Sequence, residues 1–358
     1  MRITDRPIRI GIVGGNPERG WAKDTHIPAL ATLSDYVVNA VSARSQDIAD
    51  AAARAFGVPR AFGDSLALVR DPEIDVVVVT VKVPEHRAIV LAALAAGKHV
   101  YCEWPLGRNA AEAEELSAAA DRAGTHVVIG LQGLSAPAVQ RAASLVAQGA
   151  IGQPLTLRVL SFTAGWGPAF PPHYAYLQDK RNGATLLSVP GGHTLAAMEA
   201  VVGPIVELDA RTSVLRKTVR NLGTGETIER NCPDHMLMIA RHASGCVSSL
   251  EVIGTKLPPP FRFELSGSKG RLAISGIGGD YQADNLTLDA SDGVDATIDA
   301  TQLKGSPANV AEVYRRFAHD LRHDVRTVPD FRTALRLTRL LDAIDIASET
   351  GRRQKLEA

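Results

Sequence analysis

The sequence predicts an α/β protein with two domains: an N-terminal doubly wound parallel sheet, and a C-terminal α/β domain with an open, mostly antiparallel sheet. A chain of 358 residues is long for a single hydrophobic core. Up to residue 130, apolar runs rich in Val alternate with alanine-rich segments of helical period, as in sheets that helices cover on both faces. After Gln132 the strand-like segments alternate apolar and polar residues instead. We therefore expect domains at residues 1–133 and 134–358.

The first domain is expected to contain five buried strands separated by helices. Continuous apolar runs are typical of strands that are buried on both faces. Two of the helices end in a glycine, Gly97 and Gly124, just before a strand, and glycine is the usual residue after a helix C-terminus. The expected strands are 8–13, 36–41, 75–81, 98–102 and 125–130, and the expected helices are 47–57, 85–97 and 110–124.

The second domain is expected to begin with an amphipathic helix over 135–154 that Gly149 closes, and to end with helices at 310–323 and 331–348. Its strands alternate apolar and polar residues between Gly, Pro and Asn turns. This pattern predicts an antiparallel sheet with one face solvated or covered by helices. The expected strands are 155–162, 205–214, 234–242, 246–254, 262–268 and 270–275.

The overall composition indicates an ordinary globular protein without a strongly charged partner. The 39 basic and 39 acidic side chains cancel, so the total charge does not favour binding to nucleic acid or to an anionic membrane. No apolar run approaches the ~18 residues of a membrane span, and the N-terminus lacks a signal-peptide core. Cys102, Cys232 and Cys246 have no metal-ligand spacing, so we expect no metal and reduced thiols. A cytoplasmic location is expected.

The first expected strand runs into a glycine-rich loop, "GGNPERGW", and then into a helix. Such a loop lets backbone N–H groups approach a pyrophosphate at a helix N-terminus, as in Rossmann dinucleotide-binding domains. Against the Gly-x-Gly-x-x-Gly spacing, Gly14 takes the first place and Asn16 replaces the second glycine. Gly20, followed by Trp21, lies one position late. A plain turn is the alternative, but the position in a strand–helix alternation favours NAD or NADP as cofactor.

The end of the second strand indicates which dinucleotide is preferred. Sites that prefer NAD place Asp or Glu there to bind the ribose 2′-hydroxyl. This chain has Ser42 and Arg44 instead, and an arginine with flanking hydroxyls suits a 2′-phosphate. The alternative is that Arg44 is an ordinary solvated loop residue. The sequence favours NADP over NAD.

Several motifs occur along the chain in a characteristic order. They include "GIVG", "THIPAL", "AALAAGKHVYCEWPL", "GAIGQPLTL", "GGHTL" and "FELSGSKGRLAI". In this order the chain resembles the glucose–fructose oxidoreductase/inositol dehydrogenase (Gfo/Idh/MocA) family over nearly its whole length. "GWAKDTHIPAL", "CEWPL" and "PDHMLM" are similar to the subgroup of the yeast galactose-regulon corepressor and its bacterial oxidoreductase-like relatives. The resemblance implies a Rossmann domain followed by an α/β domain with an open, mostly antiparallel sheet.

The resemblance also implies a nicotinamide dinucleotide at the carboxyl edge of the first sheet. Contacts are then expected from residues that follow the later strands of that sheet. Among the histidines near this edge, His26 is expected to pack or cap locally, and His86 is not expected to catalyse. The further expected cofactor contacts are Val81, His86, Glu103, Trp104 and Gln132.

The chain departs from the family pattern at two places that carry chemistry. Family enzymes have Glu-Lys-Pro after the fifth strand and an Asp-x-x-x-His element in the second domain. Here the turn is Glu103-Trp104-Pro105, and Val189 stands four residues before His193. Tryptophan cannot accept the proton of a hydroxyl, because its indole N–H only donates. A lysine-based mechanism is therefore excluded, although the indole can stack on the nicotinamide or on a sugar.

Three residues are the candidates for proton transfer in the second domain. His193 follows two glycines that permit close approach of a ligand, and an imidazole suits acid–base work at neutral pH. A structural histidine bonded to the backbone is the alternative. His235 follows Asp234, but neighbouring strand residues point to opposite faces, so the two are not expected to pair. Tyr174 lies in an aromatic loop, 164–176, that is expected to cover a substrate or to contact a second subunit.

Two functions fit these residues. The first is NAD(P)-dependent oxidation or reduction of a sugar or polyol hydroxyl, with His193 as acid/base. The second is a catalytically silent dinucleotide-binding regulatory protein that acts through a protein partner, which the missing Lys and Asp favour. The aromatic loop and His193 fit the enzyme. The open sheet face predicts a homodimer or homotetramer in which subunits cover that face.

Overall fold

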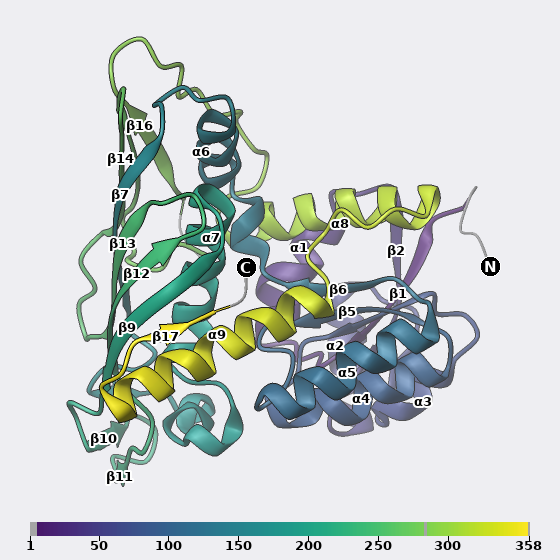
Figure 1. Cartoon of the computed structure of the whole chain (residues 1–358). Helices are drawn as coiled ribbons and strands as arrows, with labels where there is room; N and C mark the ends of the chain where they lie inside the picture. Colours follow the sequence, from purple (N-terminus) through teal and green to yellow (C-terminus); the bar gives the residue numbers. More distant parts are fainter. Residues whose placement is uncertain (1–5, 283–284, 357–358) are drawn as a thin grey trace. The chain divides into compact units, whose positions relative to one another are not determined.

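The computed structural model describes residues 6–282 and 285–356 (Figure 1). The chain divides into two compact units: Met1–Gln132 with Pro307–Arg336, and Gly133–Ser306 with Leu337–Ala358. The expected second domain contained the whole C-terminal part of the chain. The structure instead assigns the helix near residue 310 to the first unit, because its aromatic side chains are buried there. Residues 1–5, where the expected first domain begins, and residues 357–358, where the expected second domain ends, lie outside the described residues.

The sheet of the first unit is parallel throughout, in the order β3-β2-β1-β4-β5-β6 among the described residues. This confirms the predicted doubly wound sheet. Every residue of β4 is a buried valine, as expected for a strand covered on both faces. The sequence pattern missed β3, because two residues are too few to show a period. The strands are β1 Ile8–Val13, β2 Tyr36–Ser42, β3 Ala61–Phe62, β4 Val76–Val79, β5 His99–Glu103 and β6 Val127–Gly130.

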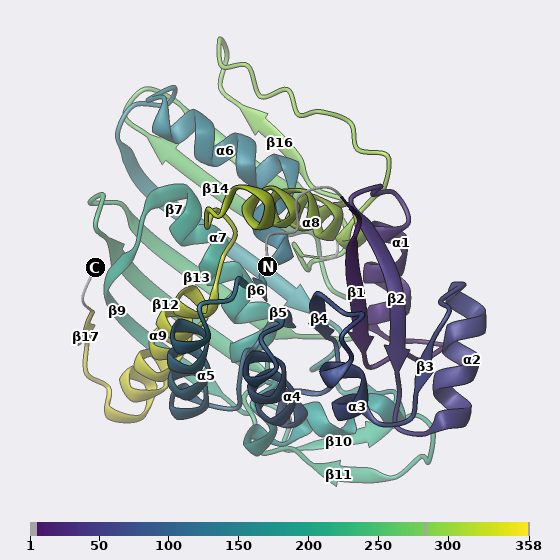
Figure 2. The same cartoon turned by 90° about the vertical axis from the view of Figure 1, so that its right-hand side faces the viewer.

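Helices cover both faces of this sheet (Figures 1 and 2). On one face lie α3 Ser65–Arg70, α4 Val83–Ala95 and α5 Ala110–Ala123. On the other face lie the π-helical turn η1 Ala22–His26 with α1 Ile27–Leu30, α2 Gln46–Phe56, and α8 Ser306–His323. Gly124, at φ 67°, ends α5 in the left-handed conformation, as glycine readily does.

The second unit is built on a sheet of the order β16-β15-β14-β7-β13-β12-β9-β17 among the described residues. The β7–β13 pair is parallel and the other pairs are antiparallel, which confirms the predicted mostly antiparallel sheet. The strands are β7 Pro154–Thr163, β9 Ile205–Ser213, β12 His235–His242, β13 Val247–Gly254, β14 Phe261–Gly267, β15 Arg271–Gly276, β16 Thr287–Ala290 and β17 Gln354–Lys355.

One face of this larger sheet is covered by helices and the other is open in the described chain (Figure 1). The covering helices are α6 Pro137–Ala147, α7 Gly192–Val202 and, from Leu337 onward, α9 Phe331–Thr350. The alternation in β12 follows from this, because Met236 and Met238 are buried while Leu237 and Ile239 are exposed.

A smaller sheet pairs β8 Ala169–Phe170 with β10 Thr218–Asn221 and β11 Thr227–Glu229. None of the described helices is both long and apolar enough to cross a membrane.

Candidate functional site

The glycine loop after β1 packs tightly against the ends of β2 and β4. Gly14 has φ +108°, and a Cβ there would lie 2.8 Å from Thr80 Oγ1. A Cβ on Gly15 would lie 2.2 Å from Val41 Cγ2. The N–H groups of Gly14 and Gly15 both donate to the carbonyl of Ser42, at 3.1 and 2.8 Å. The loop therefore needs the second glycine of "GGNPERGW" as much as the first, although the dinucleotide spacing did not single out Gly15.

In the rest of the loop, two backbone N–H groups donate to the side chain of Asn16. Asn16 Oδ1 accepts from the N–H groups of Glu18 and Arg19, at 2.9 and 3.2 Å. Gly20, at φ +104°, has open space around its Cα, and Trp21 follows it as the first residue of the next turn. Donors of this kind at the start of a helical segment are the groups that bind phosphate in dinucleotide sites.

The two residues predicted to read the ribose have different environments. Ser42 is fully buried, and its hydroxyl lies 3.1 Å from that of Ser65, so its side chain packs inside the unit. Arg44 is exposed and makes no hydrogen bond or ion pair with any other described residue. Its guanidinium is therefore available to an anion at the end of β2.

The Glu103-Trp104-Pro105 turn lies at the carboxyl end of β5, beside the loop that follows β4. Trp104 is buried, and its peptide bond to Pro105 is cis. His86, in the first turn of α4, reaches both loops: Nε2 lies 3.0 Å from the Val81 carbonyl and Nδ1 lies 3.0 Å from the Pro105 carbonyl. Burial lowers the pKa of His86 below its usual value. A neutral ring carries one N–H, so it donates to one of these two carbonyls at a time.

A second histidine holds the other side of the same turn. His26 Nε2 lies 2.9 Å from Glu103 Oε1, and Nδ1 lies 2.7 Å from the hydroxyl of Tyr314. His26 and Tyr314 are fully buried. The expectation of local packing for His26 missed this arrangement, because its partners lie 77 and 288 residues away. Gln132, the last residue of the N-terminal segment of the first unit, is also buried.

In the second unit, His193 lies in the first turn of α7, directly after the π-helical turn Leu187–Gly191 that contains Val189. Its side chain is buried, and Nδ1 has no hydrogen-bond partner among the described residues. The Tyr281 hydroxyl donates to the His193 carbonyl at 2.6 Å and so fixes the backbone rather than the ring. Burial lowers the pKa of His193 to about 3, so the ring is neutral at neutral pH and is a weaker base than a solvated imidazole.

The aromatic loop contains both anchored and exposed rings. Trp166 is buried, and its indole N–H donates to the Leu177 carbonyl at 3.1 Å, so it anchors the loop and offers no stacking surface. Tyr174 is 38% exposed and packs edge-on against His173, with 4.5 Å between ring centroids. Burial raises the pKa of Tyr176 to about 12. Tyr174 and His173 are the exposed rings of this loop, and either can meet a ligand.

A buried ion pair that sequence reasoning missed holds this loop in place. Arg230 donates to Asp234 at 3.1 Å, to the carbonyls of Trp166 and Gly167 at 3.0 and 2.7 Å, and to Gln178 at 2.8 Å. The side chains of Arg230 and Asp234 are completely inaccessible to solvent. The expected "PDHMLM" motif contains the acid, but a pattern in sequence does not indicate its partner.

The structure separates the two histidine candidates of the second unit. His235 begins β12 and its Nε2 lies 3.0 Å from Glu251 Oε1 on β13. Its neighbour Met236 points to the face that the helices cover, where Met236 approaches the glycine before α7. Since strand residues alternate between faces, His235 lies on the open face, away from His193. Asp234 pairs with Arg216 and Arg230, and not with His235.

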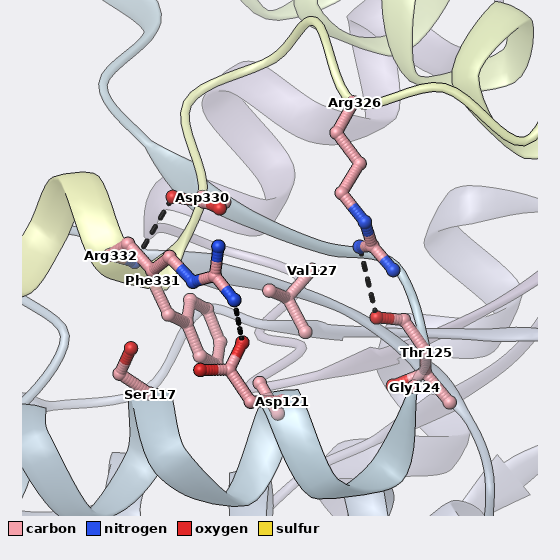
Figure 3. Close-up of a pocket in the computed structure, with 10 residues that line it drawn as sticks. Ser117, Asp121, Gly124, Thr125, Val127, Arg326, Asp330, Phe331 and Arg332 are labelled. Atoms are coloured by element: carbon pink, nitrogen blue, oxygen red, sulfur yellow. Dashed lines mark hydrogen bonds and ion pairs between the residues drawn. The ribbon is translucent and has the colours of Figure 1, made fainter.

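Figure 3 shows a cavity of about 160 Å³ in the first unit. Arg332 pairs with Asp121 at 2.9 Å, and Arg326 donates to the Thr125 carbonyl at 3.3 Å. The cavity is smaller than the ~300–1,000 Å³ of typical ligand pockets. Thr125 precedes β6, so the cavity lies at the amino edge of the sheet, whereas dinucleotides bind beyond the carboxyl ends of the strands. It is not part of the candidate site.

Comparison with known proteins places both units among described families. Residues 8–131 match the oxidoreductase family with an NAD-binding Rossmann fold, and residues 137–276 match the Gal80p C-terminal domain. The chain is 34% identical over 287 residues to dehydrogenase aclE of Aspergillus oryzae. The aligned residues cover 75% of this chain and 77% of that protein. It is 32% identical over 310 residues to the galactose/lactose metabolism regulatory protein GAL80 of Kluyveromyces lactis, covering 80% and 67%.

Solved structures share the fold over the full length of the chain. The super-repressor mutant of Gal80p from Saccharomyces cerevisiae superposes with a TM-score of 0.89 at 23% identity, covering 98% of both chains. Levoglucosan dehydrogenase in complex with NADH and levoglucosan superposes with a TM-score of 0.83 at 21% identity, covering 99% of this chain and all of the other. One fold therefore occurs in both an enzyme and a regulator.

Proposed function

Because this chain belongs to the Gfo/Idh/MocA family of oxidoreductases with an NAD-binding Rossmann fold, we propose that it oxidises or reduces a sugar or polyol hydroxyl with NAD or NADP. The observation that carries the proposal is His193, a buried imidazole whose Nδ1 has no partner among the described residues. A buried polar atom without a hydrogen bond is costly, and a catalytic role is one reason for a protein to keep it. A related fold that binds NADH and a sugar, levoglucosan dehydrogenase, supports the substrate class.

The proposed division of chemistry follows from these residues. A bound NAD or NADP would supply the hydride acceptor for the carbon that bears the hydroxyl. The hydroxyl proton is proposed to pass to His193, whose buried Nδ1 has no other partner among the described residues, and a C=O group results. The glycine loop between Gly14 and Gly20 is the proposed position of the phosphates, and Tyr174 supplies an accessible ring and hydroxyl for the sugar.

The second candidate function is a dinucleotide-binding regulator without catalysis. The match of residues 137–276 to the Gal80p C-terminal domain and the absence of a base at Trp104 favour it. A screen of sugars and polyols with NADPH or NADP⁺, and with NADH or NAD⁺, followed at the nicotinamide absorbance, tests between the two. Turnover with any substrate supports the enzyme. Tight dinucleotide binding with no turnover across the screen supports the regulator.

Arg44 is proposed to select NADP by pairing with its 2′-phosphate. Arg44→Ala is expected to weaken NADPH by about 1.5–3 kcal/mol, the value of a hydrogen bond to a charged group, and to leave NADH nearly unchanged. Fluorescence titration of both dinucleotides measures the difference. Arg54→Ala removes another exposed arginine, in the last turn of α2, and is expected to change neither affinity. Equal loss of NADH and NADPH in Arg44→Ala would show that the guanidinium does not read the phosphate.

The open face of the larger sheet is proposed to be a subunit interface. Leu237 and Ile239 on β12 and Val247 on β13 are each about half exposed on that face. A second copy of the chain would cover them, which avoids a large apolar patch in water. Ile239→Lys is expected to lower the sedimentation mass at micromolar concentration, whereas Leu222→Lys, at a residue 64% exposed after β10, is expected to leave it unchanged. A wild-type mass of one chain would refute the interface.

A further inference from the structure

Three loops meet at the carboxyl edge of the parallel sheet of the first unit, because β1, β4 and β5 are neighbours in it. They are the glycine loop and η1 after β1, the loop at Val81 after β4, and the turn at Glu103-Trp104-Pro105 after β5. Ligands of such sheets bind at this edge. The shape of a dinucleotide site there depends on how firmly the three loops are held together.

Two buried imidazoles connect these loops from opposite faces of the sheet. His26, at the end of η1, bonds the Glu103 carboxylate at 2.9 Å. His86, in α4, lies 3.0 Å from the carbonyls of both Val81 and Pro105. Both rings have at most 1% of their surface exposed. We infer that His26 and His86 are positioning residues that hold the Trp104 turn against the other two loops and thereby set the affinity for the dinucleotide.

The His26 connection is the stronger of the two, because every group in it is satisfied. The Tyr314 hydroxyl donates to Nδ1, and the Nε2 hydrogen is donated to the Glu103 carboxylate. Tyr314 is itself fixed, since its ring packs on Tyr101 with centroids 5.2 Å apart. The carboxylate fills the space above Gly130, where a Cβ would lie 2.7 Å from it. The carboxylate therefore has one position, between an imidazole and the backbone of β6.

The inference depends on dinucleotide binding and not on turnover, so a failed sugar screen leaves it intact. His26→Leu removes the donor to Glu103 and is expected to weaken NADPH and NADH alike by about 10- to 100-fold, the range for loss of a hydrogen bond to a charged group. His26→Gln keeps an N–H donor and is expected to retain most of the affinity. Tyr314→Phe removes only the hydroxyl and is expected to give a smaller loss. His86→Leu releases Pro105 and is expected to weaken both dinucleotides.

His126→Leu is the matched control. His126 is a buried histidine of the same unit that bonds a carboxylate, Asp324, at 3.1 Å, but it precedes β6 and so lies at the opposite edge of the sheet. It is expected to lower the thermal unfolding temperature without changing either dinucleotide affinity. Amide hydrogen exchange supplies a readout without ligand: exchange over residues 103–107 is expected to accelerate in His26→Leu and not in His126→Leu.

The positioning role of His26 is supported if His26→Leu loses dinucleotide affinity and hydrogen-exchange protection over residues 103–107. The variants His26→Gln and His126→Leu must then retain both. This role is overturned if His26→Leu binds both dinucleotides as the wild type does, or if His126→Leu weakens them equally, since loss of stability would then explain the effect. A wild-type protein that binds neither dinucleotide would overturn it as well.

Discussion

Replacement of His193 by alanine is expected to lower kcat on any sugar or polyol substrate by about 10²–10⁴-fold, the usual contribution of a general acid–base group. The affinity for NADPH and NADH is expected to stay within a few-fold of wild type, because His193 belongs to the second unit and the dinucleotide-binding residues belong to the first. Steady-state kinetics at saturating cofactor, together with fluorescence titration of the cofactor, measures the two effects separately.

His235→Ala is the matched control for this prediction. His235 is also a histidine of the second unit, but it pairs with Glu251 on the open face of the sheet. We expect its replacement to leave kcat nearly unchanged. If His193→Ala retained full activity, proton transfer would have to move to another group, of which the exposed Tyr174 is the first to test. If His235→Ala were the inactive variant, the assignment of the two histidines would be reversed.

Asp234→Ala is expected to lower the free energy of unfolding by about 3–5 kcal/mol, because removal of one partner leaves a buried charge without compensation. Asp234 accepts from Arg230 at 3.1 Å and from Arg216 at 3.0 Å, and it also accepts the N–H of Leu215 at 2.6 Å. Arg230 is completely buried and would keep its charge. Urea unfolding, followed by circular dichroism, measures the loss.

An exposed ion pair of the same unit gives the comparison. Asp289 pairs with Arg271 at 2.9 Å, and the two side chains are 69% and 57% exposed. Asp289→Ala is expected to cost less than about 1 kcal/mol, as for other surface pairs. The aromatic loop should also become more susceptible to proteolysis in Asp234→Ala alone, since Arg230 holds the carbonyls of Trp166 and Gly167. Equal destabilisation by both variants would contradict the role assigned to burial.

Local patterns in the sequence were sufficient for most of the fold. The buried strands of the first unit appear as continuous apolar runs, and the alternation in segments such as β12 and β13 predicts the one-sided burial that the structure shows. The glycine loop is recognisable because a turn with φ near +108° at Gly14 restricts the residue type. The identity of Trp104 excludes a lysine base without any structure.

Contacts between distant segments could not be read in this way, because periodicity reports only on a residue's immediate neighbours. The helix α8 has an amphipathic pattern that fits either unit, and only tertiary packing assigns it to the first, where Tyr314 meets His26. The two-residue strand β3 has no period at all. It exists because Val41 and Ser42 of β2 offer it an edge to pair with.

The same distinction between local pattern and tertiary contact applies to the candidate site. The sequence by itself determined which residue types are present: a glycine loop, an arginine without a neighbouring acid at the end of β2, and a histidine after two glycines. Only the tertiary structure decided their states. Ser42 and His193 are buried, whereas Arg44 is exposed. The imidazole of His26 bonds the carboxylate of Glu103. Burial and partnership are properties of groups brought together from far apart in the chain, and they set the pKa and the availability of each side chain.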